Sequence, residues 1–281
     1  VLEGLVYDDA YAKAVEIQKE TGATFLHPFN DKYVIAGQGT IGLEIFEQMN
    51  NKVDTILCPI GGGGIIAGIA TAAKALNPNV KIVGVQTANI PSMYESMKSG
   101  KVTTAFKSTS IADGISVKTV GELTFNIAKD LLDEVVLVEE DEIAEAVLFL
   151  MENQKVVAEG SGAVTTAAIL TGKYKPKENE NVVLIISGGN IDVNTLNRIV
   201  VKGLINSGRR FSFITEIKDK PGGLAELTRI LSNLDANIIT ANLSSTKAIG
   251  ELSDQMTMET FDHEHIEKIK KAVSEAGLNI K

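Results

Sequence analysis

The sequence predicts an α/β protein in two parts: a parallel sheet covered by helices on both faces, then a smaller α+β domain of the ferredoxin-like type. Up to about residue 205, short apolar runs alternate with segments of helical periodicity, which is the pattern of a parallel sheet between two layers of helices. From Phe211 onward the order changes to βαββαβ. The 281 residues, 44% hydrophobic and 22% charged, are enough for two such domains.

In the first part, short β-rich runs predict the strands, and apolar residues spaced three and four apart predict the helices. The expected strands are residues 24–26, 54–60, 81–86, 135–138 and 182–187. The expected helices are residues 8–19, 41–49, 65–76, 121–132, 140–154 and 162–170. A linker is expected at residues 203–208 (GLINSG), which begin and end with glycine.

In the second part, the expected elements are strand 211–217, turn 219–223, helix 224–234, strands 236–244 and 252–261, helix 265–276 and a last strand that ends at Lys281. His263 and His265 fall on the last helix, where we expect them to be solvated surface residues.

Composition excludes several classes of protein. The net charge of −9 offers no basic face for nucleic acid. The one cysteine, Cys58, cannot form an internal disulfide, so we expect a core residue and a reducing, cytoplasmic setting. The longest uncharged stretch, residues 55–73, contains Pro59 and four glycines, which would break a helix inside a membrane. We therefore expect no membrane partner.

A run of four glycines carries the strongest chemical signal. Gly61, Gly62, Gly63 and Gly64 join a predicted strand to a predicted helix. Glycines there let backbone N–H groups close on an anion at the helix N-terminus, whereas a plain turn would need only one or two. The nucleotide motifs fit poorly, because Gln86 stands where an acidic ribose ligand is expected and the lysine of a P-loop is absent.

A second glycine loop begins at Ser187 and should open at the same carboxyl edge of the sheet, where ligands of open α/β folds bind. The residues alone leave two interpretations of Ser187 open: a ligand contact, or the N-cap of the next helix.

Several motifs together resemble the threonine dehydratase and serine racemase group, which are pyridoxal-phosphate enzymes of the tryptophan-synthase-β-like fold (fold type II). The resemblance covers residues 1 to about 205. The motifs are His27-Pro28-Phe29, residues 34–41 (VIAGQGTI), residues 59–64 (PIGGGG), residues 111–114 (IADG), residues 159–163 (EGSGA) and residues 187–192 (SGGNID).

The resemblance implies a role for each loop. The backbone of Gly61, Gly62, Gly63 and Gly64 and the amide of Ile65 would hold pyridoxal 5′-phosphate, and Ser187 would hydrogen-bond the pyridine nitrogen. A serine there softens the electron sink and suits elimination of a β-hydroxyl. Glu159 would lie near the cofactor, although its interpretation as a buried helix cap stays open.

The implied reaction is deamination of L-threonine to 2-oxobutanoate and ammonia. Its Schiff-base lysine lies in an N-terminal segment of the family that does not occur here. The chain begins at Val1 without a methionine, so we expect a missing N-terminal part, no catalytic residue in this chain, and an inactive fragment. Four lysines in ordinary solvated settings are not expected to substitute: Lys52, Lys74, Lys118 and Lys155.

Other functions remain open. Serine dehydratase and serine racemase are alternatives within the same fold, but the racemase branch holds a divalent cation with acidic groups, and residues 86–92 (QTANIPS) contain none. We therefore expect no metal site. A non-catalytic amino-acid sensor is an alternative of another class. The choice between isoleucine biosynthesis and threonine breakdown stays open.

The tail resembles an ACT domain, the amino-acid-binding module of many allosteric metabolic enzymes, through residues 219–224 (DKPGGL) and 236–238 (ANI). The resemblance implies effector binding by Gly222, Gly223, Leu224, Asn237 and Ile238, in a pocket between two tails. A homodimer or homotetramer is therefore expected, although a tail that only dimerises the enzyme is the alternative. The implied domains are a remnant of a small subdomain (1–30), a large pyridoxal-phosphate domain (31–205) and the ACT domain (208–281).

Overall fold

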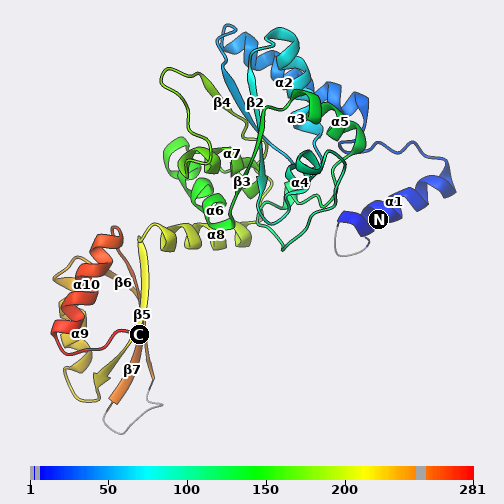
Figure 1. Cartoon of the computed structure of the whole chain (residues 1–281). Coiled ribbons are helices and arrows are strands. Elements are labelled where there is room, and N and C mark those ends of the chain that lie inside the picture. The colour runs from blue at the N-terminus through cyan, green and yellow to red at the C-terminus, as the bar shows by residue number, and fades with distance from the viewer. Residues whose placement is uncertain (1–2, 4–6, 245–250) are drawn as a thin grey trace. The chain divides into compact units, whose positions relative to one another are not determined.

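The computed structural model describes residue 3 and residues 7–244 and 251–281 (Figure 1). The chain divides into two compact units, and each is described by itself. The first comprises residues 1–140 and 164–187, and the second comprises residues 141–163 and 188–281. Within the described residues, no helix has the length and apolar character needed to cross a membrane.

A four-stranded parallel sheet forms the centre of the first unit. Its strands are β1 (Thr55–Pro59), β2 (Lys81–Thr87), β3 (Glu134–Val138) and β4 (Val182–Leu184), in the order β3-β2-β1-β4. Strand β1 is buried along its whole length, as expected for a strand covered on both faces. Cys58 on this strand is a fully buried core residue, as the sequence predicted.

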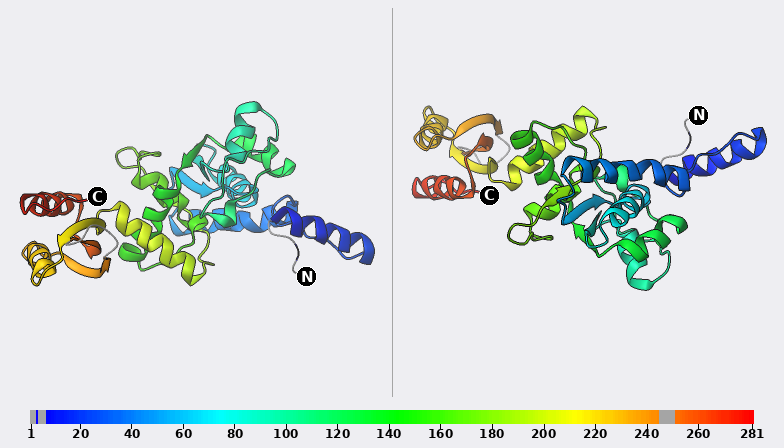
Figure 2. Two further views of the ribbon diagram at one scale, coloured as in Figure 1. Left: turned by 90° about the horizontal axis from the view of Figure 1, so that it is seen from below. Right: turned by 90° about the horizontal axis from the view of Figure 1, so that it is seen from above.

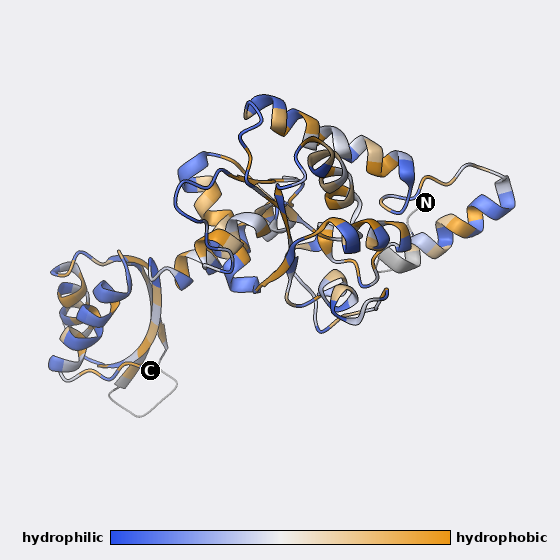
Figure 3. Cartoon of the chain, turned by 45° about the horizontal axis from the view of Figure 1, so that its top comes forward, coloured by the Kyte–Doolittle hydropathy of each residue, from blue (hydrophilic) through white to orange (hydrophobic). Residues whose placement is uncertain are grey.

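Helices surround this sheet (Figures 1 and 2). They are α2 (Lys32–Gln48), α3 (Gly64–Leu76), α4 (Ser92–Ser99), α5 (Glu122–Leu131) and α7 (Gly160–Leu170), with a 3₁₀ turn at Asp113–Ile115. Helix α1 (Tyr7–Thr21) lies away from the sheet in Figure 1. Both figures show α2 running beside α3. In Figure 3 the helices carry alternating hydrophobic and hydrophilic stretches, as amphipathic helices against a sheet do.

Helix α2 begins nine residues earlier than the sequence predicted. Asp31 is its N-cap, and its carboxylate accepts hydrogen bonds from the N–H groups of Tyr33 (2.8 Å) and Val34 (3.1 Å). Gly37 and Gly39 lower the helix propensity of the segment before residue 41. Gly39 and Gly42 serve packing, because a Cβ at either position would lie 3.1 Å from a backbone carbonyl of α3.

Some boundaries were predicted wrongly. Residues 24–26 form no strand, because no other segment pairs with them in the described part of the chain. Strand β4 ends three residues early, although the N–H of Ile185 still donates to the carbonyl of Leu57 (3.0 Å). Helix α4 and the 3₁₀ turn were not predicted.

The second unit contains the ferredoxin-like fold that the sequence predicted. Strands β5 (Arg210–Lys218), β6 (Asn237–Ser244) and β7 (Glu251–Glu259) form an antiparallel sheet in the order β5-β7-β6. Helices α9 (Gly223–Ser232) and α10 (His263–Glu275) pack against it, and a bridge between Thr215 and Ile280 places the end of the chain beside β5.

The second unit also contains helices outside the ferredoxin-like fold. Helix α6 (Glu140–Phe149) continues into a π-helical turn (Leu150–Gln154), and α8 (Val193–Asn206) occupies most of the range predicted as a linker. The bidentate pair of Arg209 and Glu152, with contacts of 2.6 and 3.1 Å, connects the end of α8 to this turn.

His265 is not the surface residue that the sequence predicted. It is 6% exposed, its Nδ1 accepts from the N–H of Phe261 (3.1 Å), and its Nε2 lies 2.6 Å from the carbonyl oxygen of Leu234. Because Nδ1 accepts, Nε2 carries the proton and donates. His263 is exposed, as predicted, with its Nε2 2.9 Å from the carbonyl oxygen of Asn206.

Candidate functional site

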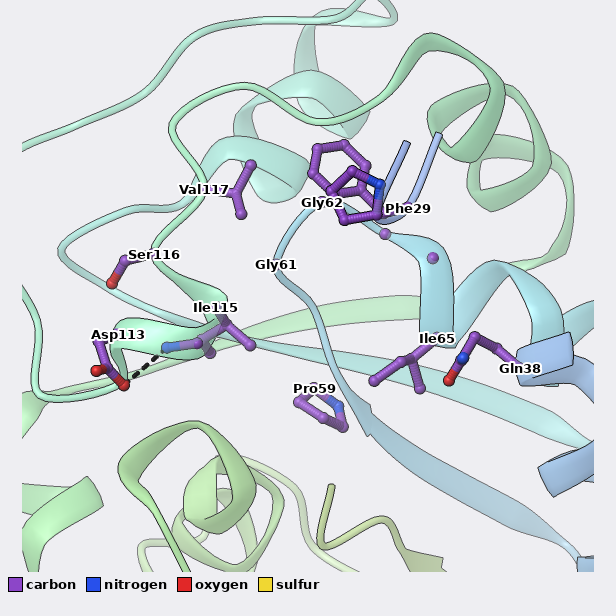
Figure 4. Close-up of a pocket in the computed structure, with 14 residues that line it drawn as sticks. Phe29, Gln38, Pro59, Gly61, Gly62, Ile65, Asp113, Ile115, Ser116 and Val117 are labelled. Atoms are coloured by element: carbon purple, nitrogen blue, oxygen red, sulfur yellow. Dashed lines mark hydrogen bonds between the residues drawn. The ribbon is translucent and has the colours of Figure 1, made fainter. Parts of the chain in front are cut away.

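A cavity of about 420 Å³ lies at the carboxyl edge of the parallel sheet, where β1 ends. Figure 4 shows its lining, with Asp113 and Ser116 on one side and Gln38 on the other. The lining residues are Pro28, Phe29, Gln38, Pro59, Gly61, Gly62, Gly63, Gly64, Ile65, Asp113, Gly114, Ile115, Ser116 and Val117. The structure therefore brings the glycine run and Ile65 together on one cavity.

The backbone of this run offers donors without acceptors. In the described part of the chain, no N–H from Gly61 to Ile65 donates a hydrogen bond, and Gly62, Gly63 and Gly64 are buried. A buried donor without an acceptor costs about 1–3 kcal/mol. A bound anion would satisfy several of these donors at once, and the first turn of α3 adds its partial positive charge.

The loop has no space for side chains. Gly63 has a φ of 95°, and a Cβ at Gly62 would lie 2.3 Å from Cγ of Phe29. A Cβ at Gly61 or Gly64 would lie 3.0 Å from Ile115 or Phe29. Glycines at these positions leave the backbone accessible from the cavity, and this geometry fits the phosphate group of pyridoxal 5′-phosphate.

The turn before α2 fixes Phe29 against the loop. Nδ1 of His27 accepts hydrogen bonds from the N–H groups of Phe29 (3.3 Å) and Asn30 (3.0 Å), and the rings of His27 and Phe29 meet edge to face with centroids 4.5 Å apart. Burial lowers the pKa of His27, which keeps Nδ1 free to accept, and Asp31 opposes the shift. The sequence did not single out Phe29 as a wall of the cavity.

The opposite side of the cavity contains one carboxylate. Oδ1 of Asp113 accepts from the N–H of Gly114 (2.8 Å), and the side chain is exposed at the cavity mouth. The chemical contrast between this carboxylate and the donors at Gly61 to Ile65 gives the cavity two ends, one for an anion and one for a cationic or hydrogen-bond-donating group.

Ser187 follows β4, the direct neighbour of β1 in the sheet. It is exposed and lies at the same edge as the glycine run, but it is not among the residues that line the cavity. It does not cap the next helix, because the N-cap of α8 is Asp192, whose carboxylate accepts from the N–H groups of Asn194 and Thr195 (both 2.9 Å). The ligand interpretation of Ser187 stays a prediction.

Glu159 lies beside the second glycine loop within the second unit. Its N–H donates to the carbonyl of Gly188 (3.1 Å), and a Cβ at Gly188 would lie 2.6 Å from Oε1 of Glu159. Gly188 is therefore needed so that the glutamate side chain can pack on this loop.

None of the four lysines considered from the sequence lines the cavity. Lys52 and Lys155 are exposed, Lys74 pairs with Asp133 (2.9 Å), and Lys118 lies over the ring of Phe106. In the described residues there is also no cluster of three or more His, Cys, Asp or Glu side chains that could hold a metal ion.

The candidate effector residues fall into two groups. Gly222 (φ 95°), Gly223 and Leu224 follow the end of β5, whereas Asn237 and Ile238 open β6. The strand register places these groups at opposite ends of the sheet, because Arg210 and Asn237 both pair with Glu259 while Lys218 pairs with Glu251. One copy of the second unit therefore does not bring the two groups together.

Comparisons with known proteins agree with this architecture. The family model described as pyridoxal-phosphate dependent enzyme matches residues 1–188, and the model for the ACT domain matches residues 212–278. The chain is 47% identical over 284 residues to L-threonine ammonia-lyase of Thermotoga maritima, covering 100% of this chain and 70% of that protein. It is 46% identical to L-threonine ammonia-lyase of Geobacter sulfurreducens, covering 96% and 67%.

Solved structures show the same relationship. Maize serine racemase matches with a TM-score of 0.65 and 37% identity, covering 73% of this chain and 63% of that chain. The processed form of threonine deaminase isoform 2 from Solanum lycopersicum matches with a TM-score of 0.66 and 38% identity, covering 72% and 59%. The chain thus spans less than two thirds of these two structures and about two thirds of the two relatives by sequence.

Proposed function

The chain belongs to the family of pyridoxal-phosphate-dependent enzymes, and we propose that it provides the phosphate-binding and regulatory parts of an L-threonine ammonia-lyase. The complete enzyme would convert L-threonine to 2-oxobutanoate and ammonia. The main support for this proposal is the row of N–H groups without acceptors that faces an open cavity. These groups fit a phosphate monoester, and the cavity leaves room beside the phosphate for a ring and an amino acid.

Each part of the chain would have a definite task. The amides of Gly61 to Ile65 bind and orient the phosphate, and Phe29 walls the cavity on that side. Ser187 would donate to or accept from the pyridine nitrogen without forcing a full positive charge on the ring. When bound, the cofactor supplies an electron sink for the charge left when the α-proton departs. Among the described residues no lysine lines the cavity, and we propose that a lysine in the part of the enzyme that this chain does not span moves this proton.

Binding by the purified 281-residue chain tests the cradle directly. We expect pyridoxal phosphate and inorganic phosphate to compete for one site in titration calorimetry. Gly62→Ala should abolish the binding of both ligands, because its Cβ would displace Phe29. Gly37→Ala is the matched control, because a Cβ there meets nothing within 4 Å. Equal binding by Gly62→Ala and the parent chain would refute the proposed cradle.

Activity is tested by the release of 2-oxobutanoate from L-threonine. We expect turnover from the chain extended to the length of its relatives and none from the 281 residues alone. Serine dehydratase or serine racemase is the alternative. Release of pyruvate from L-serine would indicate the dehydratase, and chiral analysis of the recovered serine would indicate the racemase.

We also propose that residues 208–281 form the regulatory domain, which binds an amino-acid effector within a homodimer or homotetramer. The separation of the two groups of candidate residues in one copy supports a pocket made from two copies. A cytoplasmic location agrees with the single, buried Cys58.

A further inference from the structure

Two buried side chains hold carbonyl groups of the glycine loop from outside the cavity. The hydroxyl of Thr124 on α5 donates to the carbonyl of Gly62 (2.6 Å), which also accepts from the N–H of Gly121 (3.2 Å). Nε2 of Gln86 at the end of β2 donates to the carbonyl of Ile60 (3.3 Å). Both side chains are 0% exposed, and neither lines the cavity.

The geometry of the peptide bond connects these contacts to the cavity. In a trans peptide, the C=O and the N–H point in opposite directions. Holding the carbonyl of Gly62 toward α5 therefore turns the N–H of Gly63 the other way. The same argument applies to the carbonyl of Ile60 and the N–H of Gly61. Gly61 and Gly63 both line the cavity, and neither N–H has an acceptor among the described residues.

The loop needs such an external constraint because glycine does not constrain itself. Rotation of the peptide between Gly62 and Gly63 meets no Cβ on either side, so both orientations are sterically open to it. The hydrogen bonds from Thr124 and Gly121 are the interactions that distinguish the two orientations. Thr124 also packs closely, since a Cβ at Gly63 would lie 2.8 Å from its Oγ1.

Both side chains are themselves fixed. The hydroxyl of Thr124 lies 3.0 Å from the carbonyl of Gly121, and Oδ1 of Asn30 accepts from the N–H of Leu123 (2.9 Å) to hold the start of α5. Oε1 of Gln86 accepts from the N–H of Tyr94 (2.9 Å) on α4. The constraint on the loop thus comes from two separate helices and a strand.

We propose that Thr124, assisted by Gln86, is a positioning residue that preorganises the N–H groups of Gly63 and Gly61 for a phosphate monoester. This inference rests on the proposed function, since it names the device that keeps the cradle open. Preorganised donors bind an anion more tightly because no reorientation is required at the moment of binding.

The test compares Thr124→Val, which removes the hydroxyl and keeps the shape, with Thr124→Ser, which keeps the hydroxyl. Inorganic phosphate and pyridoxal phosphate are titrated into each chain by calorimetry, and thermal unfolding is measured without ligand. We expect about tenfold weaker binding for Thr124→Val, the equivalent of one ordinary hydrogen bond, and affinity within about twofold of the parent for Thr124→Ser. A fall in unfolding temperature with unchanged affinity would overturn the inference.

A second measurement does not depend on a folded valine variant. In ¹H–¹⁵N spectra of the parent chain, the amides of Gly61 and Gly63 should shift on addition of inorganic phosphate, whereas the amide of Gly121, which already donates to Gly62, should not. Phosphate binding without a shift at Gly63 would refute the positioning role alone. Absence of any phosphate or pyridoxal phosphate binding by the parent chain would refute the proposed function itself.

Discussion

Asp254 is a carboxyl group buried in the apolar core of the second unit. It is 0% exposed, stands opposite Thr215 in the register of β5 and β7, and shares its face with Met256 and Met258. Neither of its oxygens, nor the hydroxyl of Thr215, has a hydrogen-bond partner among the described residues. Burial raises the pKa of Asp254; the backbone N–H of Asn242 opposes the shift without reaching hydrogen-bond geometry.

This burial makes the stability of the second unit depend on pH. A raised pKa means that the folded state prefers the protonated form. The contribution of protonated Asp254 to the free energy of unfolding is therefore fully present below the ordinary pKa of 3.8. It is lost as pH rises through the raised pKa of the folded state. We expect Asp254→Val to stabilise the unit near neutral pH by about 1–3 kcal/mol, because it removes an unsatisfied buried group.

The measurement is chemical denaturation of the parent and variant between pH 4 and pH 8. The difference in free energy of unfolding between the variant and the parent should grow as pH rises. Asp219→Asn, at an exposed turn position, is the control and should follow the parent. A difference that stays constant over this range would show that Asp254 is not the titrating group.

Single residues also mark where the sequence was insufficient. His265 was assigned to the surface because a histidine on an amphipathic helix is usually solvated. Its burial depends on the carbonyl of Leu234, which is distant in the sequence. Gln86 was noted only as the wrong residue for a ribose, and Thr124 carried no signal at all. Both act on backbone carbonyls that only the folded chain brings near.

At the scale of elements, the pairing of α2 and α3 depends on glycines at their contact. A Cβ at Gly68 would lie 2.3 Å from the carbonyl oxygen of Ile35 and 2.6 Å from the nitrogen of Gly39. These are backbone atoms and cannot move aside as the end of a side chain can. The two helices therefore approach more closely than any other residue at position 68 would allow.

We expect Gly68→Ala to destabilise the first unit by about 1–3 kcal/mol, the usual cost of overpacking, despite the better helix propensity of alanine. Gly37→Ala, in the exposed part of α2, should instead stabilise it by about 0.5–1 kcal/mol. Thermal unfolding of the two variants gives the comparison. If both variants shifted the unfolding temperature equally and in the same direction, the role of close helix packing would be contradicted.

The same glycines explain which elements the sequence predicted. The strands β1, β2 and β3 were found because a buried parallel strand is a short apolar run. The start of α2 was missed because Gly37 and Gly39 lower its helical signal, although Asp31 supplied a recognisable N-cap. The false strand at residues 24–26 has the right composition, but a strand exists only where another pairs with it.

At the scale of the whole molecule, the sequence predicted the position of the cavity but not all of the segments that line it. The rule that parallel strands end at one edge correctly placed the ends of β1 and β4 at the same edge of the sheet. It could not show that Phe29 and the segment from Asp113 to Val117 close the cavity, because these come from loops whose course has no periodic pattern.

The edge strands of the second sheet indicate how the proposed dimer could form. Strand β6 is an edge, and it exposes Ile239 (41%) and Leu243 (48%). In an antiparallel pair of two β6 strands, the start of one strand lies beside the end of the other. Asn237 of one copy would then lie at the end of the sheet where Gly222 of the second copy is found. In such a pair, the proposed effector pocket would form only in the dimer.

We expect Leu243→Lys to dissociate the proposed dimer. The same variant should lose the rise in unfolding temperature that we expect an amino-acid effector to produce in the parent chain. A charge at an edge strand opposes pairing, and a ligand held between two copies stabilises only the paired state. Light scattering coupled to gel filtration measures the first effect, and thermal unfolding with isoleucine, valine or threonine measures the second. Ile214→Lys is the control, because Ile214 is also exposed (39%) but lies on β5, at the opposite edge of the sheet from β6. The backbone N–H and carbonyl of Ile214 are already paired with Lys281, so this variant should keep both properties. A monomeric variant that still responds to an amino acid would place the effector site within a single copy.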